Sequence, residues 1–169
     1  MTTRDCQLRL AREEDLPEIL EIVNHNIAHS DALWNNTPQT LKQRAVWLKQ
    51  QQENDMPVFV VICEGTFFGY GSYGPFRPYE GYAQTVEHSI YVKPGMSRLG
   101  IGQMLLTALI THATEAGRHL MIGAITDTNT ASIQLHEKFG FTAMPAIPEV
   151  GRKFDRWLNL VFMYRILDS

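Results

Sequence analysis

The chain has 169 residues, of which 44% are hydrophobic and 20% are charged, a size and composition typical of one globular domain. Its 15 lysines and arginines are outnumbered by 18 aspartates and glutamates, giving a net charge of −3 that argues against a general nucleic-acid binder. The first residues hold no apolar run, and the longest apolar runs, such as 58–63, are too short to span a bilayer. We therefore expect a single cytoplasmic domain over residues 1–169, with neither nucleic acid nor a membrane as its partner.

Two residue types that often build disulfide or metal sites are sparse or poorly arranged. The only cysteines are Cys6 and Cys63, too few for a disulfide scaffold or a zinc ribbon, and we expect two reduced, partly buried thiols. His25 and His29 stand four residues apart, which is metal-ligand spacing, but the sequence offers no evident third ligand. We expect no metal.

The hydrophobic pattern predicts strands and helices in alternation along the chain. A short strand at 7–11 precedes a helix that begins with Asp15 as N-cap and runs to about residue 28. A loop at 30–37 and a helix after Pro38 follow. Further strands are predicted at 58–63, 67–73, 85–92, 120–126 and about 157–167, and further helices at about 100–116 and 130–139. This order implies an α/β fold, a mixed sheet with helices on both faces.

The most informative segment is SIYVKPGMSRLGIGQMLL at 89–106, in which a strand runs into a glycine-bearing turn that opens a helix. Gly100 and Gly102 remove side chains where a backbone approaches something closely, and the N–H groups of a helix start form an anion site. A phosphate or pyrophosphate suits this site, with Arg98 as an added donor. A Walker A loop is excluded because Gln103 follows Gly102, and a Rossmann fingerprint lacks its third glycine. A helix start with no ligand is the alternative interpretation.

Together with NTASIQLHEKFGF at 129–141, this segment resembles the GNAT superfamily of acetyl-CoA-dependent N-acyltransferases. The family pattern Gln/Arg-x-x-Gly-x-Gly/Ala maps onto 97–102, with Ser97 in its first position. Segments 72–92 and 150–163 resemble the phosphinothricin N-acetyltransferase subfamily, which includes enzymes that acetylate methionine sulfoximine and methionine sulfone. The resemblance covers nearly the whole chain. It implies a mixed, mostly antiparallel central sheet with helices on both faces, acetyl-CoA as co-substrate and a homodimer.

The resemblance also implies which residues hold the co-substrate. The central strand and the glycine turn bind the pantetheine and pyrophosphate of CoA, and the Asn129 side chain both caps the next helix and contacts the pantetheine arm. The expected cofactor-binding residues are Ser89, Ile90, Tyr91, Val92, Ser97, Arg98, Leu99, Gly100, Ile101, Gly102, Asn129 and Ser132.

Two residues are candidates for proton transfer. Glu87 precedes the apolar part of a central strand, where burial would raise the pKa of its carboxyl and suit it to accept a proton from an ammonium. A carboxylate in a salt bridge is the alternative. His136 stands where many relatives carry a tyrosine that protonates the CoA thiolate, and an imidazole can donate that proton. A helix-surface histidine beside the cofactor is the alternative. His88 alternates to the strand face opposite Glu87 and is expected to support the site.

The acceptor is expected to meet a loop rich in aromatic residues and proline. Arg77 suits a bidentate grip on an α-carboxylate, although Arg77 and Glu80 could also be solvated loop charges. The expected substrate-binding residues are Trp34, Phe76, Arg77, Pro78, Glu80, Val86, Glu87, His88 and Lys153. The resemblance implies transfer of acetyl to the α-amino group of a small amino acid such as methionine sulfoximine, methionine sulfone or phosphinothricin. Another small amine, a protein N-terminus, or a catalytically silent CoA-binding module are the alternatives.

Overall fold

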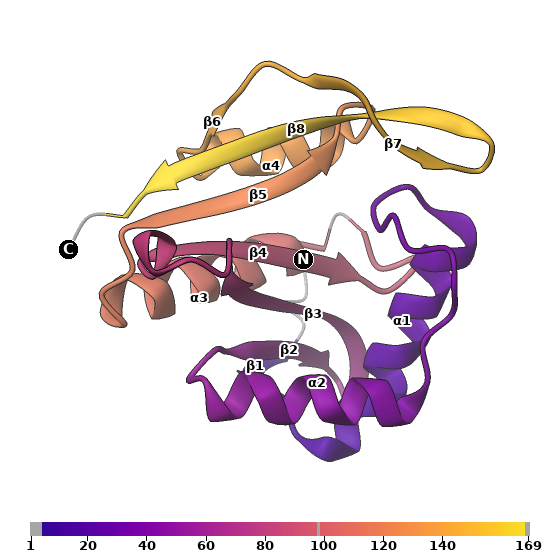
Figure 1. The fold of residues 1–169 in the computed structure, drawn as a ribbon. Coiled ribbons are helices and arrows are strands. Elements are labelled where there is room, and N and C mark those ends of the chain that lie inside the picture. The colour runs from indigo at the N-terminus through magenta and orange to yellow at the C-terminus, as the bar shows by residue number, and fades with distance from the viewer. Residues whose placement is uncertain (1–4, 98, 168–169) are drawn as a thin grey trace.

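One eight-stranded sheet organises the protein, whose computed structural model describes residues 5–97 and 99–167. The strand order is β1-β2-β3-β4-β5-β8-β6, and β7 also pairs with β8 (Figure 1). The β4–β5 pair is parallel, and the other pairs are antiparallel. This mixed, mostly antiparallel sheet confirms the expected fold class. The strands are β1 (Cys6–Leu10), β2 (Val58–Cys63), β3 (Thr66–Pro75), β4 (Thr85–Val92), β5 (Leu120–Thr126), β6 (Thr142–Ala143), β7 (Ile147–Lys153) and β8 (Arg156–Ile166).

Helices cover both faces of the sheet, as the chain order predicted. Helices α1 (Leu16–His29) and α2 (Leu41–Glu53) pack on the face that carries Tyr70 and Tyr91. Helix α3 (Ile101–Glu115) packs on the opposite face, against Tyr73 and Val86, and α4 (Thr130–Lys138) lies beyond it. Short 3-10 turns, η1 (Glu13–Asp15) and η2 (Glu80–Tyr82), complete the chain.

The structure differs from the predicted elements in two places. The Asp15 side chain does not cap α1, because its carboxylate lies 2.7 Å from the Arg9 guanidinium and also accepts the Arg12 N–H. Strands β6 and β7 were not predicted. Their segment, 142–153, contains two prolines and its side chains are mostly exposed, so it lacks the buried alternation that marks a strand in sequence.

The expectation of two reduced thiols is wrong, because Cys6 and Cys63 form a disulfide. The two residues are direct partners in the antiparallel β1–β2 ladder, and directly opposed side chains project to the same face of a sheet. They are 57 residues apart in the chain, so only the strand pairing brings them together.

Within residues 5–97 and 99–167, the helices are all too short or too polar to cross a membrane.

Candidate active site

The central feature of the site is the point where β4 and β5 separate. Their parallel ladder joins Thr85–His88 to Leu120–Gly123 and ends there, although β4 stays paired with β3 to Val92 and β5 with β8 to Thr126. The facing edges of Ser89–Val92 and Ala124–Thr126 therefore diverge (Figure 1). A cavity of about 610 Å³ opens between them, within the range of small-molecule sites.

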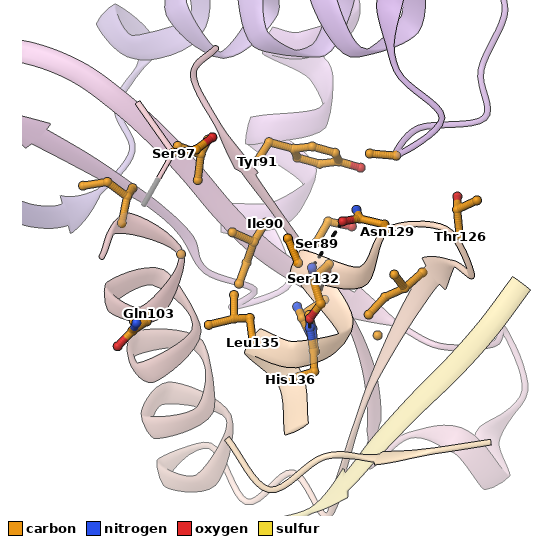
Figure 2. Close-up of a pocket in the computed structure, with 18 of the residues that line it drawn as sticks. Ser89, Ile90, Tyr91, Ser97, Gln103, Thr126, Asn129, Ser132, Leu135 and His136 are labelled. Atoms are coloured by element: carbon orange, nitrogen blue, oxygen red, sulfur yellow. Dashed lines mark hydrogen bonds between the residues drawn. The ribbon is translucent and has the colours of Figure 1, made fainter. Parts of the chain in front are cut away.

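The cavity is lined by polar and apolar groups from β4, β5, the turn before α3, and α4. Figure 2 shows Ser89 and Tyr91 of β4, with Asn129, Ser132 and His136 from the start and body of α4, among the residues that line it. The predicted cofactor-binding residues that line it are Ser89, Ile90, Tyr91, Val92, Ser97, Gly100, Ile101, Gly102, Asn129 and Ser132. Leu99 is exposed and is not among the lining residues, and Arg98 lies outside the described residues.

The two glycines of the turn serve different purposes. Gly100 is the N-cap of α3 and has φ +80°, a left-handed conformation that L side chains rarely adopt. Gly102 lets α3 approach α4, since a Cβ there would lie 3.1 Å from Leu135. The first turn of a helix has N–H groups without partners inside the helix, so the start of α3 presents donors to an anion at the cavity.

The start of α4 is fixed by its predicted cap. Asn129 Oδ1 accepts the Ser132 N–H at 3.2 Å, which orients the first turn of α4 toward β4 (Figure 2). Asn129 and Ser132, distant from β4 in sequence, reach the same cavity because α4 follows β5, which pairs with β4.

Glu87 and His88 are neighbours on β4 that lie in different environments. Burial raises the pKa of the half-buried Glu87 carboxyl, and the positive charge of Arg77 counters part of that rise. His88 is fully buried on the other face, where its Nε2 lies 3.1 Å from Nε2 of His136. Burial, and to a smaller extent the neighbouring His136, lowers the pKa of His88 to about 3. Burial also lowers the pKa of His136. Both imidazoles are therefore neutral near pH 7.

The aromatic loop between β3 and β4 is anchored by ring contacts. The Phe76 ring lies edge-on to Tyr82 and Phe162, with centroids 5.7 and 6.1 Å away. The Arg77 guanidinium lies 4.8 Å from the Phe76 ring centroid, and its charge acts on Glu87. Pro78 and Glu80 are exposed in this loop. The structure thus brings the predicted Arg77 and Glu87 to the same region.

Three of the predicted substrate-binding residues make contacts within the protein. Val86 is fully buried in the core beneath α3. The Lys153 ammonium donates to the backbone carbonyls of Asn26, Ser30 and Leu33, so it holds the loop that follows α1. Trp34 Nε1 donates to Thr126 Oγ1 at 3.0 Å, tying the same loop to the end of β5.

Sequence reasoning missed the β5 side of the cavity. Gly123, Ala124, Ile125 and Thr126 line it, as does Ala32 from the loop after α1. One signal was available: a glycine inside a strand, as at Gly123, marks a bulge or a close approach by another group. Among the described residues, acidic, histidine and cysteine side chains form no cluster of three or more that could hold a metal ion.

Comparisons with known proteins agree with this geometry. The model of the acetyltransferase (GNAT) family matches residues 19–141. An L-methionine sulfoximine/L-methionine sulfone acetyltransferase of Pseudomonas aeruginosa is 43% identical over 96% of this chain and 95% of its own. An acetyltransferase of Salmonella typhimurium, solved with its cofactor acetyl-CoA, superposes with a TM-score of 0.94 at 40% identity, over 97% of this chain and 95% of that one. A phosphinothricin acetyltransferase of Sinorhizobium meliloti, also solved with acetyl-CoA, gives 0.93 at 33% identity, over 96% and 88%.

The chain therefore belongs to the GNAT family of acetyltransferases and is an acetyl-CoA-dependent N-acetyltransferase.

Removing the Lys153 ammonium tests its structural assignment. Lys153→Met leaves three backbone carbonyls without their shared donor, and we expect a loss of about 2–4 kcal/mol in the free energy of unfolding. Urea unfolding measures it. Lys49→Met is the control, because Lys49 is exposed and only pairs with Glu53 at 3.7 Å on the helix surface. Equal stability of the two variants would contradict the assignment.

Proposed function

We propose that this chain, as a single domain over residues 1–169, transfers the acetyl group of acetyl-CoA to the α-amino group of a small amino acid. Methionine sulfoximine, methionine sulfone and phosphinothricin are the acceptors we expect, since relatives that carry these names cover nearly the whole chain. The observation that carries the proposal is the cavity between β4 and β5. The half-buried carboxylate of Glu87 is not among its lining residues, but it precedes the lining residue His88 on β4 and feels the positive charge of Arg77.

Several features of the cavity fit acetyl-CoA. The first turn of α3 offers N–H donors to the pyrophosphate, and the diverging edges of β4 and β5 offer backbone groups to the amide-bearing pantetheine arm. We propose that the lining residues on β4, in the 97–102 turn and on α4 hold these parts. N–H groups on the edge of β4 can also polarise the thioester carbonyl.

Glu87 is proposed as the general base. An ammonium must lose a proton before its nitrogen can attack the thioester carbon, and a carboxylate with a raised pKa is suited to accept it, directly or through one water. The N–C bond then forms as the C–S bond breaks. Because Glu87 acts in its ionised form, activity should fall as the pH drops through its pKa.

Arg77 is proposed to recognise the α-carboxylate of the acceptor. It is exposed on a loop whose Phe76 contacts Tyr82 and Phe162, and its guanidinium lies 4.8 Å from the Phe76 ring centroid. Its fork geometry matches a carboxylate, and its place near Glu87 would direct the α-ammonium toward the base.

We also propose a homodimer that acts in the cytoplasm as a detoxifying enzyme, without metal, nucleic acid or membrane. Exposed apolar side chains on and beside the β7–β8 hairpin, namely Ile147, Val150, Phe154 and Trp157, support a second copy as the partner. The Cys6–Cys63 disulfide joins the edge strand β1 to its neighbour β2, away from the β4–β5 cavity.

An acceptor panel tests the function. With acetyl-CoA and a thiol reagent, we expect CoA release with methionine sulfoximine, methionine sulfone or phosphinothricin, and little with polyamines, aminoglycosides or peptides bearing a free N-terminus. Release with the polyamines, aminoglycosides or peptides, but not with the amino acids, would overturn the proposed acceptor class.

Replacing the base tests the mechanism. Glu87→Gln should lower kcat by about 100-fold or more, because the neutral amide cannot accept the ammonium proton, while acetyl-CoA affinity measured by calorimetry stays unchanged. Glu115→Gln, an exposed change at the end of α3, is the control. A kcat near that of the unmodified enzyme at pH 7 would remove Glu87 from the mechanism.

Replacing the loop arginine tests acceptor recognition. Arg77→Ala should raise KM for the amino acid by about 10–100-fold through loss of a charge-assisted pair, and leave KM for acetyl-CoA unchanged. Arg77→Lys should recover only part of the loss. A decarboxylated analogue should react poorly with the unmodified enzyme and lose little more with Arg77→Ala. Equal reaction of analogue and amino acid would exclude the carboxylate clamp.

A further inference from the structure

Two buried imidazoles meet where the β4–β5 ladder ends. His88 is 4% exposed and His136 is 3% exposed, and their ring planes are nearly parallel, at 18°, with centroids 5.0 Å apart. The Phe141 ring lies edge-on to both, at 5.6 and 5.1 Å. Both histidines line the cavity, so their proton positions bear on the chemistry there.

The hydrogen bonds determine which nitrogens carry protons. His136 Nδ1 lies 2.6 Å from the Ser132 carbonyl oxygen, which can only accept, so Nδ1 carries a proton. A neutral imidazole has one N–H, so His136 Nε2 is bare and accepts the proton of His88 Nε2 at 3.1 Å. His88 Nδ1 is then a bare acceptor, and it is buried without a hydrogen-bond partner in the described structure.

The surroundings keep this pair neutral. The pair contacts β5 at Gly123, α4 at Ser132, and Phe141 after α4, none of which carries a charge. Within the described residues, the only titratable group found to act on His88 is His136, and only burial and the Ser132 carbonyl act on His136. Glu87, the nearest carboxylate in sequence, alternates to the other face of β4.

We propose that His88 is a positioning residue, which donates to His136 and holds it as the Nδ1–H tautomer with both nitrogens engaged, so that His136 shapes the cavity and does not protonate the CoA thiolate. This inference rests on the proposed function and overturns the role expected for His136. An acid at this position would need a free N–H, and the one N–H of His136 is held by Ser132.

The proton balance can be met without His136. The ammonium gives one proton to Glu87, which passes it to solvent, and the neutral nitrogen attacks the thioester carbon. As the N–C bond forms and the C–S bond breaks, the nitrogen loses its second proton to the sulfur, directly or through a water. The products are the amide, the free thiol and one released proton.

Gly123 is part of the same arrangement. A Cβ at this position would lie 3.1 Å from Nε2 of both histidines, so only glycine leaves the inter-ring hydrogen bond undisturbed. Gly123→Ala should therefore perturb the pair even though no hydrogen-bonding group is removed.

Nitrogen NMR of the full protein labelled with ¹⁵N-histidine tests the tautomer without acetyl transfer. Between pH 5.5 and 8 we expect His136 to show a protonated Nδ1 and a bare Nε2, with no titration, while exposed His119 serves as the internal reference. Gly123→Ala should shift the Nε2 signals of both histidines. A protonated Nε2 on His136, or an imidazolium that forms in this range, would overturn the proposal whether or not an acceptor is known.

Kinetics with the best acceptor separate positioning from packing. His88→Phe keeps a ring but removes the donor, so His136 Nε2 is freed. We expect a new histidine ionisation in the kcat profile, on the acid side of the ordinary histidine range because burial still lowers the pKa of His136. His88→Gln, whose amide can still donate, should restore the original profile. His136→Phe should act mainly on KM for acetyl-CoA, because this ring lines the cavity, and should leave the limbs of the kcat profile in place. A histidine limb in the unmodified profile that His136→Phe removes would contradict the proposal, because it would show that His136 exchanges a proton in the reaction.

Discussion

The separation of β4 from β5 is the constraint on which the remaining structure depends. Two parallel strands that stayed paired would satisfy each other's backbone groups and leave no room between them. Here the ladder ends at His88 and Gly123, and the imidazoles of His88 and His136 occupy the position beside that end. Beyond it, β3 and β8 continue to hold the outer edges of the two strands, so the inner edges diverge without loss of the sheet. The cavity, its backbone lining and its access to the start of α3 all follow from this one interruption.

An opening between strands would weaken the sheet if nothing bridged it elsewhere. The loop after α1 bridges the opening. It follows a helix that packs beside β3 and β4, and it is held by side chains or backbone of β5, β7 and β8. Lys153 of β7 donates to the carbonyl of Asn26 in α1 and to those of Ser30 and Leu33 in the loop. Arg156 of β8 pairs with Asp31 of the loop at 2.6 Å, and Trp34 of the loop donates to Thr126 of β5. These contacts join residues about a hundred positions apart in sequence. The same loop presents Ala32 to the cavity, so the element that ties the two sides together also forms part of the site.

Burial acts on adjacent residues of β4 with opposite chemical results. Desolvation disfavours a charge of either sign, so it raises the pKa of Glu87 and lowers that of His88. The first effect makes the carboxylate a stronger base, with Arg77 limiting the rise. The second keeps the histidine pair uncharged beside the cavity. One strand thus carries a group that can exchange a proton on one face and a neutral, hydrogen-bonded group on the other, because alternation along β4 places the two side chains on different faces.

The sequence by itself determined the local features: strands at 58–63, 85–92 and 120–126, the helix that follows Gly100, and the Asn129 cap all appear where periodicity and turn chemistry predicted them. The resemblance to the GNAT superfamily, which rests on motifs continuous in the chain, also pointed to most of the β4, turn and α4 residues that line the cavity, although not to Met96, Gln103, Ala131 or Leu135. Only the tertiary structure decided the rest. The β5 lining, the Cys6–Cys63 disulfide, the carbonyls around Lys153 and the pairing of His88 with His136 depend on which strands lie side by side and where their register ends. Such contacts join residues far apart in sequence, and a local pattern carries no information about the partner across the sheet.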